Sequence, residues 1–188
     1  FSLSSFADPA SGGDLRFFDE QNRELVHEID EWNASGQSTV WVQVKELTPA
    51  SNIIAYWGNA GDVTPPAYRS DGSLWSGHEG VWHLDDTLDS SANSRTGTAN
   101  GGAVPGSSGT VGKGLSLDGT DDYLSIGGYG GVSGSGARSV SLWLKSNQSS
   151  SGLAGWGTAG NLWNLSWSTQ GPYVSTDNAG GKRQGSFN

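Results

Sequence analysis

Short runs of alternating apolar and polar residues, the pattern of β-strands, recur along the chain. In residues 39–47 three valines fall on one side and Trp41, Gln43 and Lys45 on the other, as a period of two requires. Similar runs occupy residues 15–18, 25–32 and 52–58. Their β-branched and aromatic residues favour strands over helices. The pattern predicts a small antiparallel β-module over residues 1–62.

A second set of short runs follows a stretch that has no clear period. Residues 63–78 contain the adjacent Pro65 and Pro66 and are predicted to form a linker. Beyond it we expect strands at residues 80–84, 115–117, 123–126, 139–145 and 162–167. Asp118 and Gly119 are a turn signal, so residues 115–126 predict a hairpin with an acidic tip. Residues 79–188 are the second predicted unit.

The composition supports the same all-β fold class. The chain has 188 residues, of which 30 are glycine and 34% are hydrophobic, and nine are tryptophan. Glycine costs about 1 kcal/mol relative to alanine inside a helix, whereas short strands joined by polar turns tolerate it. Because aliphatic residues are few, the aromatic residues are expected to supply much of the core.

Charge and residue types exclude several classes of partner. The chain carries 10 basic and 19 acidic residues and a net charge of −9, which argues against nucleic acids and anionic membrane surfaces. The same acidity suits calcium and a secreted location. The sequence contains no cysteine, so disulfides and thiolate metal sites are excluded. It also contains no run of about 20 apolar residues, and we expect no membrane insertion.

Motifs in the first half resemble a known type of domain. G-D-L-R-F at residues 13–17, L-V-H-E-I-D-E-W at 25–32, V-W-V-Q-V at 40–44 and I-A-Y-W-G-N at 54–59 resemble a small bacterial β-domain of uncharacterised function. The resemblance covers about residues 7–60. That domain commonly precedes a laminin-G-like domain in exported proteins.

Motifs in the second half resemble the laminin-G-like, concanavalin A-like lectin-glucanase family. They are V-W-H-L at residues 81–84, D-S-S-A-N at 89–93, G-K-G-L-S-L-D-G-T-D-D-Y-L-S-I at 112–126 and V-S-L-W-L-K at 140–145. The resemblance implies a jelly-roll, an antiparallel β-sandwich, over residues 79–188. Such domains normally continue further, so we expect a piece of a longer exported protein. The expected location is extracellular, on the cell surface or in the periplasm.

The same resemblance implies a calcium ion between a loop and the acidic turn. The candidate ligands are Asp89 and Asn93 in the loop and Asp118, Asp121 and Asp122 in the turn. Hard oxygen ligands of this kind suit a six- to eight-coordinate Ca²⁺ ion. Ala92 and Arg95 depart from the family pattern and bear on this site. The alternative is that the aspartates only cap turns.

Carbohydrate binding would use aromatic side chains with polar neighbours. The candidates are Trp156, Trp163, Trp167 and Tyr173, with Asn161 and Arg183 as hydrogen-bonding partners. The alternative for the strand tryptophans is that they fill the core. Trp156 lies between glycines and is expected to be the exposed platform in a loop, whereas Trp143 is expected to pack.

No catalytic constellation emerges from the sequence. The acidic run of Glu28, Asp30 and Glu31 is interpreted as a solvated strand edge, and the histidines show no metal-site spacing. Neither a nucleophile elbow nor a P-loop is present. We therefore expect no enzyme.

The sequence thus predicts a non-catalytic binding module of a secreted or surface bacterial protein. Its expected role is carbohydrate recognition or adhesion, supported by calcium, with a polysaccharide or cell-surface glycan as the partner. The alternatives are a structural or assembly domain that contacts another protein, and an accessory region of a polysaccharide-degrading enzyme.

Overall fold

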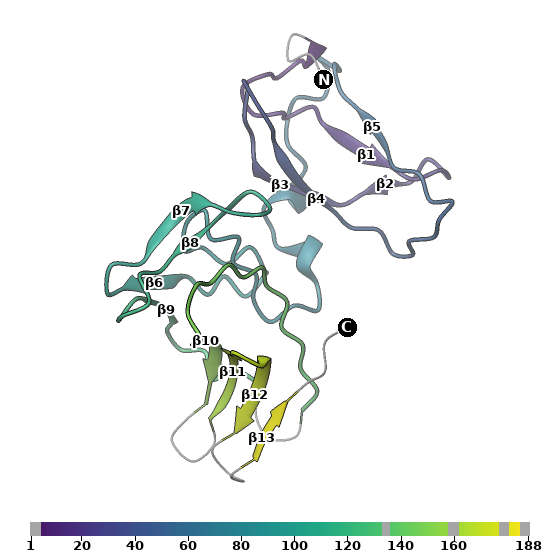
Figure 1. The fold of residues 1–188 in the computed structure, drawn as a ribbon. Coiled ribbons are helices and arrows are strands. Elements are labelled where there is room, and N and C mark those ends of the chain that lie inside the picture. The colour runs from purple at the N-terminus through teal and green to yellow at the C-terminus, as the bar shows by residue number, and fades with distance from the viewer. Residues whose placement is uncertain (1–4, 133–135, 158–161, 177–180, 185–188) are drawn as a thin grey trace.

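The computed structural model describes residues 5–132, 136–157, 162–176 and 181–184. This part of the chain forms antiparallel β-sheets and two short 3₁₀ helices, η2 (Ala67–Arg69) and η3 (Ser73–Trp75) (Figure 1). The antiparallel all-β class is therefore confirmed. The jelly-roll arrangement stays a prediction.

Two small sheets form in the first 60 residues. In one, β1 (Arg16–Phe18) lies between β2 (Glu24–Leu25) and β5 (Ile54–Tyr56). In the other, β3 (His27–Glu31) pairs with β4 (Thr39–Val42). The predicted strand at 25–32 is thus interrupted at Val26, whose carbonyl accepts the N–H of Gln43 at 2.9 Å. This bond lies outside the assigned strands. The observed strand β4 ends at Val42, just before Gln43, although the prediction extended it to residue 47.

The remaining strands form three further sheets. The strand β6 (Gly97–Asn100) pairs with β9 (Tyr123–Ile126), and β7 (Val104–Ser108) pairs with β8 (Lys113–Ser116). A four-stranded sheet contains, in order, β10 (Ser150–Trp156), β11 (Trp163–Ser168), β12 (Gly171–Thr176) and β13 (Gly181–Gln184). This sheet lies at the far end of the molecule from β1, β2 and β5 in Figure 1.

The predicted hairpin over residues 115–126 is wrong. The strands on either side of the acidic turn, β8 and β9, belong to different sheets and pair with β7 and β6. The segment after β6 approaches the turn so closely that a Cβ atom at Gly101 would lie 2.4 Å from the Asp121 carbonyl oxygen. The partner of β9 is therefore a strand from earlier in the chain, which local alternation does not reveal.

Two other predicted strands are also absent from the described residues. Residues 80–84 are held by Asp89 and by a bond from Ser90 N–H to the Val81 carbonyl instead of by a ladder. Residues 139–145 have no strand partner in the described part of the chain. Their alternating side chains are exposed, and Trp143, expected to pack, is 75% exposed.

The buried side chains of the described residues all lie between residues 6 and 91. They are Phe6, Leu15, Leu74, Asp14, Arg16, His27, Asp89 and Ser91. Phe6 packs edge-on against Trp32 and stacks on Trp57. Five of the eight buried side chains are polar or charged, so hydrogen bonds to buried groups carry much of the organisation of this part.

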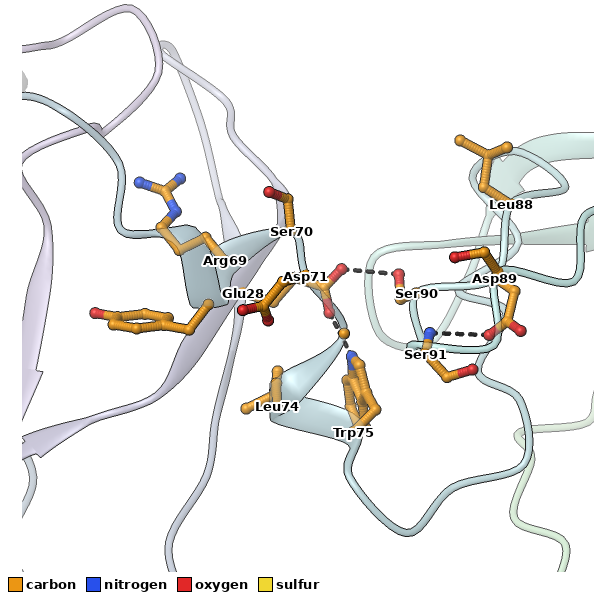
Figure 2. Close-up of a pocket in the computed structure, with 13 residues that line it drawn as sticks. Glu28, Arg69, Ser70, Asp71, Leu74, Trp75, Leu88, Asp89, Ser90 and Ser91 are labelled. Atoms are coloured by element: carbon orange, nitrogen blue, oxygen red, sulfur yellow. Dashed lines mark hydrogen bonds between the residues drawn. The ribbon is translucent and has the colours of Figure 1, made fainter.

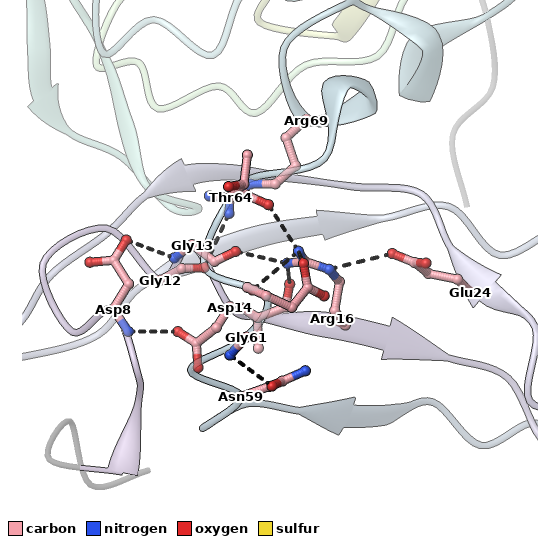
Figure 3. Close-up of polar contacts among 12 residues, drawn as sticks. Asp8, Gly12, Gly13, Asp14, Arg16, Glu24, Asn59, Gly61, Thr64 and Arg69 are labelled. Carbon is pink, nitrogen blue, oxygen red and sulfur yellow. Dashed lines mark hydrogen bonds and ion pairs between the residues drawn. The ribbon is translucent and has the colours of Figure 1, made fainter.

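Asp14 and Arg16 connect the start of β1 to residues 7–8 and to the segment that follows β5 (Figure 3). The Asp14 carboxylate, 2% exposed, accepts the backbone N–H groups of Ala7 at 2.9 Å, Asp8 at 3.0 Å and Gly58 at 2.5 Å. Burial raises the pKa of Asp14, but these hydrogen bonds outweigh burial and lower it overall. Arg16 donates to the Gly13, Leu15 and Thr64 carbonyls and pairs with Asp62 at 2.8 Å.

We predict that Asp14→Ala strongly destabilises the fold. The substitution leaves three backbone N–H groups without their acceptor, and each buried unsatisfied group costs about 1–3 kcal/mol. Asp14→Asn keeps one acceptor oxygen and is expected to cost less. Urea unfolding of both variants measures the difference.

Asp86→Ala is the matched control, because Asp86 is exposed and, within the described part of the chain, accepts only the N–H of Leu88. If Asp14→Ala and Asp86→Ala lower the free energy of unfolding equally, the structural role of Asp14 is refuted.

Candidate functional site

A pocket of about 250 Å³ lies where the first β-module meets the segments that follow it (Figure 2). Its walls come from β3, from η2 and η3, and from residues 88–94. Glu28, Asp71, Leu74, Trp75, Leu88 and Ser90 are among the residues that line it. The stretch predicted as a linker therefore folds into one wall, with Leu74 buried and its carbonyl accepting Gln43 Nε2–H at 3.0 Å.

Glu28 joins three segments at the pocket. Its Oε1 accepts the Ser90 hydroxyl at 2.8 Å, and its Oε2 accepts the Trp75 indole N–H at 2.5 Å (Figure 2). The same Oε2 lies 3.3 Å from His83 Nε2. A carboxylate with three partners has a fixed orientation, and it retains room for about one more donor.

Behind Glu28 a second carboxylate contacts the same histidine. Asp30 Oδ2 accepts the Trp41 indole N–H at 3.1 Å and lies 3.9 Å from His83 Nδ1. The Trp41 ring stacks on the His83 ring with centroids 5.5 Å apart. The Asp30 side chain is only 4% exposed, so the interpretation of this acidic run as a solvated strand edge is wrong for Glu28 and Asp30. Alternation correctly placed both side chains on one face of the strand. No local sequence signal, however, shows that residues 75–90 pack over that face.

Each group in this cluster affects the ionisation of the others. Burial raises the pKa of Glu28, but hydrogen bonds from His83, Trp75 and Ser90 outweigh it and lower the pKa. Burial lowers the pKa of His83, yet Glu28 and Asp30 outweigh burial and raise it. The pKa of Asp30 is raised, mainly by burial. Glu28 and His83 thus favour each other's charged forms, which makes Glu28 a fixed acceptor.

The loop that carries Ser90 is held by Asp89. The buried Asp89 carboxylate accepts the backbone N–H groups of Val81, Ser91 and Arg95, each at 2.9 Å. Asn93 Nδ2 donates to the Glu79 carbonyl at 3.2 Å. These two predicted calcium ligands therefore fix the loop in this structure.

Gly72, between η2 and η3, brings the other wall against this loop. Its φ is +77°, and a Cβ atom there would lie 2.2 Å from Ala92 N. The two walls of the pocket are therefore in backbone contact.

The acidic turn gathers the other three predicted calcium ligands. One carboxylate oxygen from each of Asp118, Asp121 and Asp122 lies within 4.8 Å of the others. Oxygens that bind one Ca²⁺ ion at 2.3–2.6 Å are separated by distances of this size. Asp122 Oδ1 is buried and has no hydrogen-bond partner, as an oxygen reserved for a cation would. Asp89 is not in this group.

The tryptophans predicted to bind sugar lie on the sheet of β10–β13. Trp156 ends strand β10 and is not in a loop as expected; it is partly buried, and its Nε1–H donates to the Val132 carbonyl at 3.2 Å. It pairs with Trp163 of β11, and their rings stack with centroids 4.2 Å apart. Trp167 shares this face because it lies four residues after Trp163 on the same strand.

The other candidates of the sugar site differ in where the sheet places them. Tyr173 pairs with Ser166, so it lies on the opposite face of the sheet from Trp163 and Trp167. Arg183 lies in β13 opposite Val174, which pairs with Leu165 between the two tryptophans, so its register position is on the tryptophan face. Asn161 falls outside the described residues.

Residues 11–100 match the family model described as a domain of unknown function (DUF2341). The chain contains a DUF2341 domain. An uncharacterised domain is thus confirmed in the first half, and it extends to residue 100, beyond the stretch of about residues 7–60 expected for it. No curated protein and no solved structure matches the chain significantly.

The DUF2341 domain includes the pocket and the Glu28–His83 cluster, whereas the acidic turn and the tryptophan face lie outside it. It also spans the predicted boundaries at 62/63 and 78/79, which stay predictions. In the described ranges, no helix has the length and apolar character needed to cross a bilayer.

His27 lies inside the DUF2341 domain, behind the pocket residue Tyr68. It is fully buried between Phe17 and Tyr68, and its Nε2 has no hydrogen-bond partner. The Tyr68 hydroxyl donates to Glu24 and lies 3.3 Å from His27 Nδ1. Burial is the main reason that the pKa of His27 falls from 6.5 to about 4.

His27 predicts a loss of stability in mild acid. Between pH 6.5 and about 4 the unfolded chain binds a proton that folded His27 does not, so stability falls by roughly 3 kcal/mol across this window. His83 acts in the opposite direction: its raised pKa gives a contribution that is present below 6.5 and lost as pH rises. Urea unfolding over this pH window should show the fall for the native chain.

In His27→Phe, which keeps a ring and does not titrate, the fall should be much shallower. The exposed His78→Phe is the control and should retain it. Equal pH slopes for the native chain and His27→Phe would contradict the prediction.

Proposed function

We propose that the chain is a non-catalytic module that binds carbohydrate through Trp156, Trp163 and Trp167. The observation that carries the proposal is that these three tryptophans share one face of the β10–β11 pair and that all three are partly exposed. Indole faces offer broad apolar surface to the C–H groups of pyranose rings. The net charge of −9 favours a neutral glycan over a polyanionic one.

The proposal includes the wider setting that the sequence suggests. Residues 79–188 would form a laminin-G-like, concanavalin A-like jelly-roll, and the protein would act outside the cell, on its surface or in the periplasm. The antiparallel sheets of this region and the acidic composition of the chain as a whole support this setting.

Calcium support is the second element of the proposal. Asp118, Asp121 and Asp122 would hold a Ca²⁺ ion, and the buried, unpartnered Asp122 Oδ1 supports this assignment. Because the turn precedes β9, a cation there would fix the end of the β6–β9 sheet.

One observation favours a protein-contact function as the second candidate. Residues 139–145 expose Val140, Leu142, Trp143 and Leu144. Apolar side chains exposed together mark interaction surfaces more often than isolated ones do. An assembly domain would use this segment, with no need of the tryptophan face.

The carbohydrate proposal predicts that Trp163→Ala weakens retention on neutral polysaccharides in affinity gel electrophoresis. Losing one aromatic contact should raise the dissociation constant about tenfold. Tyr173→Ala is the matched control: it removes an aromatic side chain from the opposite face of the same sheet, and should leave retention unchanged.

If both variants lose retention equally, the substitutions have disrupted the folding of the sheet, and the tryptophan face is not specifically responsible for binding. If the native chain is not retained by any polysaccharide and residues 139–145 bind a protein, the assembly function replaces the carbohydrate function.

The calcium proposal predicts a higher melting temperature in Ca²⁺ than in EDTA. A ligand at 100 times its Kd stabilises the folded state by about 2.7 kcal/mol, which corresponds to a rise of several degrees for a chain of this size. Asp121→Asn should abolish the rise, and Asp86→Asn, outside the turn, should keep it. A melting temperature that EDTA does not change in calcium-loaded protein would exclude the site.

A further inference from the structure

The pocket of the DUF2341 domain has the chemistry of a binding site separate from the tryptophan face. The geometry points to a site for a single pyranose ring of a neutral or amino sugar, bound between η3 and residues 88–94. This inference takes its ligand class from the proposed function, but its residues are independent of Trp156, Trp163 and Trp167.

The size of the pocket limits its occupant to one ring. Its volume is about 250 Å³, slightly below the range of roughly 300–1,000 Å³ that holds drug-sized ligands. A monosaccharide unit fits this space, and an oligosaccharide or a folded peptide segment does not. A longer glycan would therefore place one terminal unit in the pocket.

Carboxylates in fixed positions supply the acceptors of the pocket. The bonds to Ser90, Trp75 and His83 orient Glu28 and leave it about one acceptor site. Asp71 at the exposed rim accepts the Ser73 N–H at 2.8 Å and a hydrogen bond from the Ser73 side chain, which leaves part of the acceptor capacity of its two oxygens for a ligand. Sugar hydroxyl and ammonium groups are the donors that such acceptors bind.

Apolar side chains supply the complementary surface. Leu74 is 6% exposed, and Leu88 on the facing loop is 57% exposed. The Trp75 indole stands between η3 and Ser90, with its N–H turned to Glu28 (Figure 2). A pyranose ring has a C–H face for such a surface and hydroxyls at its edge for the carboxylates, which a simple cation lacks.

The charge of the pocket sets its specificity. Glu28, Asp71 and Asp89 line it, and the pKa of each carboxyl is lowered, so all three are charged at neutral pH. Among the described residues that line it, the only cationic side chain is Arg69, which donates to the Gly12 carbonyl and points away from Ser90 and Asp89 in Figure 2. His83 pairs with Glu28, so Asp71 and Asp89 carry the net negative charge of the pocket. A sugar bearing a carboxylate would meet like charge, whereas an amino sugar would meet opposite charge.

Saturation-transfer NMR with the full chain tests the inference, using the methyl glycosides of glucose, glucosamine and glucuronic acid as probes. Transfer to the first two and none to the third is the expected result. Ser90→Ala, which removes a hydroxyl and one of the bonds that orient Glu28, should weaken binding of both about fivefold, the size of effect that the loss of one ordinary hydrogen bond has.

Asp71→Asn should weaken the glucosamine probe about threefold and leave the glucose probe unchanged, because a rim charge acts weakly. Its matched control is Asp86→Asn, since both aspartates are exposed and accept the N–H two residues later through Oδ1. Near-UV circular dichroism should show that each variant keeps its fold.

The inference is overturned if no probe receives saturation, if the glucuronide binds as well as the others, or if Ser90→Ala and Asp71→Asn leave binding unchanged. The two sites fail separately. Polysaccharide retention that depends on Trp163, without any pocket signal, leaves the proposed function intact. A pocket signal that survives Trp163→Ala, without polysaccharide retention, leaves the pocket inference intact and refutes the proposed function.

Discussion

Buried carboxylates, each accepting several hydrogen bonds, link segments that the sheets leave separate. Asp14 collects N–H groups from residues 7, 8 and 58, Asp89 from residues 81, 91 and 95, and Glu28 joins η3 to the loop of Ser90. Only Phe6, Leu15 and Leu74 are buried apolar residues in the described chain, so apolar burial cannot position these segments by itself. A carboxylate holds its donors in defined directions, which an apolar contact does not.

This constraint relates the sheets to the pocket. The strands of the DUF2341 domain are only two to five residues long, too short to make an independently stable sheet. Residues 67–91, which contain little regular structure, complete the packing through Leu74, Trp75 and Ser90. The pocket lies at this junction, and the groups that line it are in part the groups that hold the junction together.

Local periodicity predicted the fold class and most strands of the first half, because alternation is a property of a single segment. It failed for pairing, as β8 and β9 show: the partner of a strand depends on distant chain, and β6 carries too little alternation to be found. It also failed for residues 63–78. Two adjacent prolines suggest a linker, yet Leu74 a few residues later is buried.

The sites show the same division. The sequence indicated the tryptophans of β10 and β11 and the aspartates of the acidic turn, since residue type and spacing carry that information. It could not place Tyr173 on the opposite face or assign Asp89 to backbone N–H groups, because both depend on register and loop closure. Glu28 and Asp30 were misread because the side chains that cover them come from about 50 residues later in the chain.

Gly72 shows that this junction also depends on a residue without a side chain. Its left-handed backbone and the approach of Ala92 leave no space for a Cβ atom. The walls of the pocket can therefore meet here only because glycine has a hydrogen atom in place of Cβ. The absence of a side chain thus sets how closely the two walls approach each other at this point. Any substitution at this position would act as a wedge that pushes residues 91–92 away from Gly72.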